Sequence, residues 1–164
     1  MAVTGKIQRK YMAHYVNASM TATEEYERLG KDLEEYNVEL NANVNTTQNI
    51  LGETNTSIDG YEVSGSVAPY YAVVGSKLFA KLQDIIDNRK TLDDLKTTIV
   101  ETHLWEEPST GTYVAYKEDA IIEVTSYGGD TSGYQIPFTL HHIGNRVKGK
   151  FDPKTLTFTA DVGA

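Results

Sequence analysis

The chain of 164 residues contains no cysteine, which excludes a disulfide, a thiolate metal site and a cysteine nucleophile. It has only four histidines, and they are scattered along the chain. Two of them, His141 and His142, are adjacent on a predicted strand, where neighbouring side chains point to opposite faces and do not easily share one ion. The sequence therefore predicts no metal site.

Long apolar runs are missing as well. The longest uncharged stretch, 63–76, contains two glycines and one proline. It is shorter than the roughly 20 apolar residues that a membrane-spanning helix needs. The N-terminus lacks the continuous apolar segment of a signal peptide. We expect a protein that does not enter the membrane.

The sequence also lacks the usual signs of a catalytic centre. The glycine-rich stretch "SYGGDTSGY" (126–134) is not followed by a lysine or a helix, as a phosphate-binding loop would be, and we predict a mobile loop there. The carboxylates of "KDLEEYNVE" (31–39) have no predicted pocket that would desolvate them for acid–base work. We predict no catalytic residue and no cofactor, so the protein is not expected to be an enzyme.

Positive charge is scarce in one part of the chain. The net charge is −8, and residues 24–62 hold ten acids against two bases, while the remainder is balanced at 13 and 13. The whole negative excess therefore falls on 24–62. Such a surface repels nucleic acid, because binding to phosphates needs lysine and arginine.

Two basic groups lie outside that acidic segment. The first is Lys6, Arg9 and Lys10; the second is Arg146, Lys148 and Lys150, which alternate with uncharged residues and predict a one-sided basic strand. The second group has three interpretations: a nucleic-acid contact, a contact with the acidic segment of another copy, or a plain solvated strand. Contacts of the second kind are head-to-tail and build rings or filaments.

Alternating polarity predicts two paired strands. "YNVELNANVN" (36–45) alternates strictly between apolar and polar residues, which is typical of a strand with one buried face. Four of its five polar residues are asparagine, a residue that is uncommon in strands. "GYEVSGSV" (60–67) alternates too. We predict an antiparallel pair joined by a long loop at about 46–57.

The remaining pattern predicts one helix and several further strands. "SKLFAKLQDIIDNRK" (76–90) has helical spacing, with Ser76 as N-cap and Lys81 among its exposed residues. Strands are predicted at 95–105, 113–124, 134–143, 145–151 and 156–162, with turns at 144–145 and 152–153. This predicts a single domain, 1–164, that is mainly β with one α-helix. Its two antiparallel sheets would form a sandwich or barrel flanked by the helix.

Long stretches of the chain resemble the major tail protein, or tail tube protein, of long-tailed (siphovirus-like) bacteriophages. The resemblance covers most of 25–161 and is carried by extended runs of residues. These runs are "YERLGKDLEEYNVELNANVNTTQNILGETNTSIDGYEVSGSVAPYYA", "LFAKLQDIIDNRKTLDDLKTTIVE" and "SYGGDTSGYQIPFTLHHIGNRVKGKFDPKTLTFTAD".

The resemblance implies a fold and a role. The implied fold is that of the tube subunits of contractile tails and of type VI secretion (Hcp-like). The implied role is self-assembly into stacked six-subunit rings, which form the tail tube of the virion after assembly in the host cytoplasm. The implied partners are other copies of the chain, the tape-measure protein, the tail terminator and distal tail proteins. DNA would pass through the tube at ejection without specific binding, and no catalytic residue or cofactor is implied.

Within this resemblance we predict that the polar faces of 36–45 and 60–67 line the lumen. A conduit for DNA must not bind DNA, and amides, hydroxyls and a few carboxylates stay hydrated without gripping phosphates. The predicted lumen-facing residues are Asn37, Glu39, Asn41, Asn43, Asn45, Glu62, Ser64 and Ser66.

We also predict contacts between subunits. Ile50 and Leu51 are apolar residues in a polar loop, so we expect them to dock on an adjacent ring, together with an N-terminal arm at about 1–22. The basic strand with Arg146, Lys148 and Lys150 is expected to contact a neighbour as well.

Two alternatives stay open at this stage. The first is an inner tube subunit of a contractile tail or a type VI-like secretion system, which obeys the same physics and differs in its partners. The second is a β-rich virion binding module, which would remain monomeric or form a small closed oligomer.

Overall fold

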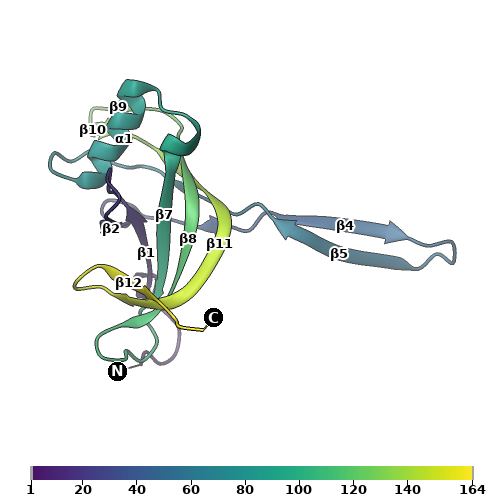
Figure 1. Ribbon diagram of the computed structural model, residues 1–164. Helices are drawn as coiled ribbons and strands as arrows, with labels where there is room; N and C mark the ends of the chain where they lie inside the picture. Colours follow the sequence, from purple (N-terminus) through teal and green to yellow (C-terminus); the bar gives the residue numbers. More distant parts are fainter. Residues whose placement is uncertain (1, 164) are drawn as a thin grey trace.

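The computed structural model describes residues 2–163. The chain is mainly β with a single α-helix, and its sheets are antiparallel, as predicted (Figure 1). The strands are β1 (Met12–Asn17), β2 (Tyr26–Arg28), β3 (Val38–Glu39), β4 (Ala42–Gln48), β5 (Thr54–Tyr61), β6 (Ser64–Val67), β7 (Lys96–His103), β8 (Tyr113–Val124), β9 (Gly128–Asp130), β10 (Gly133–Gln135), β11 (Phe138–Asp152) and β12 (Thr157–Ala160). The helix is α1 (Lys77–Asn88), and two 3-10 turns are η1 (Arg9–Tyr11) and η2 (Leu92–Leu95).

Eight strands form the main sheet, in the order β2-β1-β7-β8-β11-β6-β3, with β12 paired to β11. The remaining strands form two separate hairpins, β4–β5 and β9–β10. No sheet within residues 2–163 closes on itself. Among these residues, too, no helix combines the length and the apolar character that crossing a membrane requires.

The helix covers one face of the main sheet. Ser76 caps its N-terminus as predicted, with its side-chain oxygen accepting a hydrogen bond from the Phe79 amide at 3.3 Å. Lys81 was predicted to be exposed, but it is buried. Its ammonium group donates to the carbonyls of Asn17 and Ser19 and to the Thr97 hydroxyl. These acceptors explain how a lysine is tolerated on the packed side.

Apolar clusters lie on both faces of the main sheet. On the helix side, Leu78 and Leu82 of α1 pack with sheet residues that include Ile122 and Leu140. A second cluster forms around Phe151, whose ring lies 4.5 Å from Tyr15. The central strands of the sheet are therefore buried on both faces, and successive side chains along them contribute alternately to the two clusters.

The hairpin β4–β5 projects from this body (Figure 1). The predicted pairing of 36–45 with 60–67 is correct, but the predicted loop at 46–57 is wrong, since strands continue to Gln48 and resume at Thr54. The predicted strand 36–45 is also interrupted. Asn41 adopts a left-handed conformation (φ 47°) between β3 and β4, which asparagine tolerates better than most residues.

Other expectations are corrected by the sheet. The predicted N-terminal arm, 1–22, contains β1, which is paired on both sides and largely buried. The predicted loop 126–134 holds most of the hairpin β9–β10. Gly144 and Asn145 do not join two strands: both have positive φ and form an irregularity within β11. The turn at 152–153 is confirmed, between β11 and β12.

Candidate assembly interface

The projecting hairpin is an extended two-stranded ribbon that leaves the main sheet in register and shifts register by one residue between Asn43 and Val44. Glu39 pairs with Ser64 in the sheet, and Ala42 pairs with Tyr61 at the start of the hairpin, so the register does not change across the break. Pairing ends at Gln48 and Thr54. At about 3.4 Å per residue, β4 alone carries the hairpin about 20 Å outward.

One face of this ribbon is polar and carries two of the eight predicted lumen residues. Alternation places Asn43 and Asn45 on the same face of the hairpin as Ser57, the cross-strand partner of Asn45. In the main sheet, Glu39, Ser64 and Ser66 continue this face. Ser66 lies opposite Thr139 of β11, and their hydroxyls are 3.2 Å apart.

Asn41 lies at the break between the main sheet and the hairpin, and its side chain is hydrogen-bonded to the neighbouring segment. Its side-chain amide donates to the Glu62 carbonyl at 2.9 Å and to the Ser64 hydroxyl at 3.3 Å. Asn37 lies outside the strand, is exposed and donates to the side chain of Glu35. Pairing and alternation thus place Asn43 and Asn45 on one face of the hairpin and Glu39, Ser64 and Ser66 on one face of the main sheet. Asn41 and Glu62 lie at the break between the two, and Asn37 lies outside the strands.

The inner half of the opposite face is apolar and uncovered, whereas the outer half carries the cross-strand pair Thr46 and Thr56, whose hydroxyls are 3.3 Å apart. Val44 and Ile58 are cross-strand partners and are 61% and 55% exposed. Leu40 and Tyr61, at the root of the hairpin, are 58% and 57% exposed. Alternation in 36–45 predicted that this face would be buried. It is buried at Tyr36, where the chain lies over the body, and it is exposed from Leu40 outward.

The tip of the hairpin is a hydrogen-bonded turn with two projecting apolar side chains. The Asn49 side chain accepts hydrogen bonds from the amides of Leu51 and Glu53, and it donates to the Glu53 carboxylate at 2.7 Å. Ile50 and Leu51 are 102% and 77% exposed. The amides of Leu51 and Glu53 are hydrogen-bonded within the turn. The two apolar side chains can therefore be buried against another surface without leaving these amides unsatisfied.

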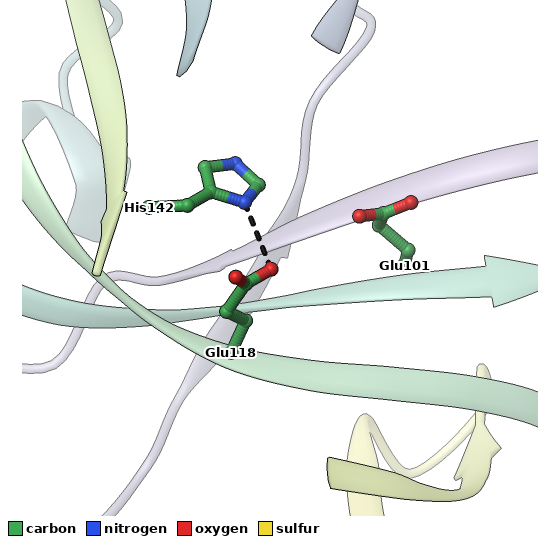
Figure 2. A group of neighbouring side chains, drawn as sticks. All are labelled: Glu101, Glu118 and His142. Atoms are coloured by element: carbon green, nitrogen blue, oxygen red, sulfur yellow. Dashed lines mark hydrogen bonds and ion pairs between the residues drawn. The ribbon is translucent and has the colours of Figure 1, made fainter. Parts of the chain in front are cut away.

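A cavity of about 740 Å³ lies where the hairpin leaves the main sheet. Its apolar wall includes Leu40, Tyr61 and Ile143, and its polar wall is a group of charged residues from three strands. Figure 2 shows Glu118 directed at His142, with Glu101 on the neighbouring strand. We call Glu101, Glu118, His142 and Arg146 the ion-pair cluster.

Arg146 links the two carboxylates of this cluster. One of its nitrogens lies 2.9 Å from a Glu101 oxygen and 3.3 Å from a Glu118 oxygen. The same Glu118 oxygen lies 2.9 Å from Nδ1 of His142, whose side chain is 1% exposed. Burial alone would lower the pKa of the Arg146 guanidinium, but Glu101 and Glu118 outweigh it and raise that pKa.

Next to the cluster, His14 is held neutral. Burial lowers its pKa to about 4, an effect that Glu101 opposes and that Arg9, His142 and Arg146 reinforce. Its ring contacts that of Tyr36 edge-on, with ring centroids 4.9 Å apart. Burial raises the pKa of Tyr36, and Glu101 raises it further.

Glu101, Glu118 and His142 are the described residues that could hold a metal ion, since their ligating atoms lie within 4.8 Å of one another. The Arg146 guanidinium, however, already pairs with both carboxylates, and a metal ion would have to displace it. The geometry is that of an ion-pair network rather than a vacant coordination sphere. His141 and His142 diverge as expected: the His142 side chain is 1% exposed, whereas the His141 side chain is 49% exposed.

The remaining predicted contact residues lie on β11. Lys148 and Lys150 are exposed and alternate with the buried residues Gly149 and Phe151, as the one-sided pattern predicted. Arg146 is engaged within its own chain, as described above.

Sequence reasoning missed the outer half of the hairpin. Thr47, Asn55 and Asp59 extend the polar side beyond 36–45, and Ile58 completes the apolar face. The signal was available in "TNTS" (54–57), which is rich in threonine, asparagine and serine and lies within the predicted loop 46–57. β-Branched threonine also favours strands, and this preference agrees with the structure.

No protein-family model matches the chain, and a search of curated proteins found no significant match.

Proposed function

We propose that this protein is a structural subunit that assembles with copies of itself into the hollow tail tube of a long-tailed bacteriophage. Stacked hexameric rings would form the tube, and the genome would pass through it into the host. The observation that carries the proposal is the projecting hairpin, which has one polar face and, on the inner half of the other face, an uncovered apolar patch.

Burial of the exposed apolar residues of the hairpin against a partner would be favourable. An isolated two-stranded hairpin is at best marginally stable in water, and this one lacks a covering layer in the single chain. Covering a half-exposed Val44, Ile58 or Tyr61 would contribute about 1 kcal/mol each. Another copy of the same chain is the simplest partner, because a repeated contact between different surfaces of one subunit builds rings and filaments.

The polar face suits the wall of a conduit. It presents amides and hydroxyls, with Glu39, Asp59 and Glu62 as its negative charges, and it carries no lysine or arginine among the eight predicted residues. DNA would slide along such a wall without counterion release, which drives binding to basic surfaces. In this proposal the sheets of neighbouring copies adjoin to complete the closed tube-subunit architecture that the open sheet of one chain lacks.

Electron microscopy of the purified protein tests the proposal directly. We expect rings or tubes with a central hole in negative stain, and a high-mass species in light scattering that grows with protein concentration. A monomer that persists at high concentration would overturn the proposal. A small closed oligomer without a bore would instead support a virion binding module.

A further inference from the structure

A second surface of the chain complements the hairpin tip. A cavity of about 530 Å³ lies between η1, β1 and the segment that follows β2. Four cationic side chains line it: Arg9, Lys10, Arg28 and Lys31. We call it the basic pocket.

The lining of the basic pocket carries a net positive charge, because one carboxylate, Glu34, stands beside the four cations. Among residues 2–163, none of the four cations forms an ion pair with a carboxylate. Arg9 donates to the Tyr36 carbonyl at 3.0 Å, and Arg28 donates to the Lys10 carbonyl at 2.8 Å. Neutral carbonyls orient these guanidinium groups without cancelling their charge, so the pocket attracts an anion.

The pocket also has an apolar lining. Met12, Leu29 and Leu33 contribute to its wall, and all three are half-buried. A free phosphate or a nucleic-acid backbone offers nothing to cover this part. A segment with both an apolar group and a carboxylate would use the whole surface.

The hairpin tip has that composition. Ile50 and Leu51 project with no cover, and the Glu53 carboxylate lies in the same turn, oriented by Asn49. The turn is already ordered by its own hydrogen bonds, so little conformational entropy would be lost on docking. We infer that the hairpin tip of one copy docks into the basic pocket of another, with Ile50 and Leu51 on the apolar lining and Glu53 among the cations.

This inference rests on the proposed function and defines its contact. The hairpin tip and the basic pocket are different surfaces, so the contact is heterologous and repeats from copy to copy. The cations would set the register and speed of docking, while the apolar side chains would hold the contact. A chain with both surfaces intact can add to both ends of a polymer. A chain that lacks one surface can bind at one end only and stops further growth there.

Cysteine cross-linking tests the contact in the full chain, because the natural sequence has no cysteine to interfere. One chain carries Leu51→Cys and a second carries Lys31→Cys; the two are mixed and oxidised. Both positions are exposed, so neither change disturbs the core. We expect a covalent dimer from this mixture. The control replaces Lys31→Cys with Lys96→Cys, another exposed lysine outside the pocket, and should give none.

Charge reversal gives an independent measurement. We expect Lys31→Glu to raise the protein concentration needed for assembly by about tenfold, and Glu53→Lys in the same chain to restore it. Tubes that form without the 51–31 cross-link would overturn this inference and leave the proposed function standing. A chain that stays monomeric would overturn both. If Lys31→Glu leaves assembly unchanged but abolishes binding of a fluorescent single-stranded oligonucleotide, the pocket serves a nucleic acid instead.

Discussion

Val44 and Ile58 face each other across the β4–β5 hairpin, and both side chains are more than half exposed to solvent. Directly behind them, Asn45 and Ser57 form the next cross-strand pair and point the other way. A ribbon with one apolar and one polar face is ordinary when it packs on a core. Here it projects from the body, and nothing among the described residues covers its apolar pair (Figure 1).

Replacing this apolar pair should abolish assembly. In Val44→Asp/Ile58→Asp, two charges would be buried without partners at the interface, and we expect light scattering to show only monomer. The matched control is Asn45→Asp/Ser57→Asp, which adds the same charge to the polar face. We expect the control to form tubes, and equal assembly of the two variants would contradict the assignment of faces.

The tip should matter separately from the apolar face. We expect Ile50→Asp/Leu51→Asp to prevent full-length tubes in negative stain, because the two projecting side chains could no longer dock on an apolar surface. Thr47→Asp/Asn55→Asp, a cross-strand pair near the tip, is the control. Full-length tubes from the Ile50/Leu51 variant would count against docking of the tip.

His14 should make the fold sensitive to acid. Its folded-state pKa of about 4 lies below the ordinary value of 6.5, so between these values the unfolded chain binds a proton that the folded chain does not. Stability should therefore fall as pH drops from 6.5 to 4, by about 3 kcal/mol from this residue. Urea unfolding of the monomeric Val44→Asp/Ile58→Asp variant measures it. Adding His14→Gln should remove most of this slope, and an unchanged slope would exclude His14 as its source.

Arg146 should stabilise the sheet by neutralising Glu101 and Glu118, whose side chains are 12% and 10% exposed. Arg146→Met leaves both carboxylates without their cation, and we expect a loss of about 2 kcal/mol in unfolding free energy. Adding Glu101→Gln and Glu118→Gln should recover much of that loss. If the triple variant is less stable than Arg146→Met, the carboxylates are not the cause.

Gly149 should be required by the close approach of β12 to β11. A Cβ atom at this position would lie 2.3 Å from the Thr159 carbonyl oxygen and 2.6 Å from the Phe158 ring. Because the first of these is backbone, we expect Gly149→Ala to lower the unfolding free energy by about 2 kcal/mol or more. Gly60→Ala is the control, since a Cβ there meets nothing within 4 Å. Equal midpoints in thermal unfolding would contradict this account.

Local pattern was sufficient for much of the fold. Strict alternation predicted the pairing of 36–45 with 60–67, and helical spacing after Ser76 predicted α1. Periodicity reports which side chains share a face, and it does so without reference to the rest of the molecule. It cannot report whether that face is covered, so Val44 was expected to be buried and Lys81 to be exposed, and both expectations were wrong.

The candidate site, too, was only partly predictable from the sequence. The run of asparagines in "YNVELNANVN" was visible in the sequence, and so was the acidic excess around it. The ion-pair cluster was not, because Glu101, Glu118 and Arg146 lie on three strands that only the sheet brings together. The basic pocket likewise joins residues from η1 to those that follow β2.

The sequence by itself determined the mainly β composition, the single helix and the two-faced character of the strand at 36–45, since each follows from short-range periodicity and charge. Only the tertiary structure decided that this strand breaks at Asn41 and leaves the body as a hairpin. The physical reason is that exposure of a face depends on what packs against it. From Leu40 outward, nothing within the described chain covers the apolar side of "YNVELNANVN".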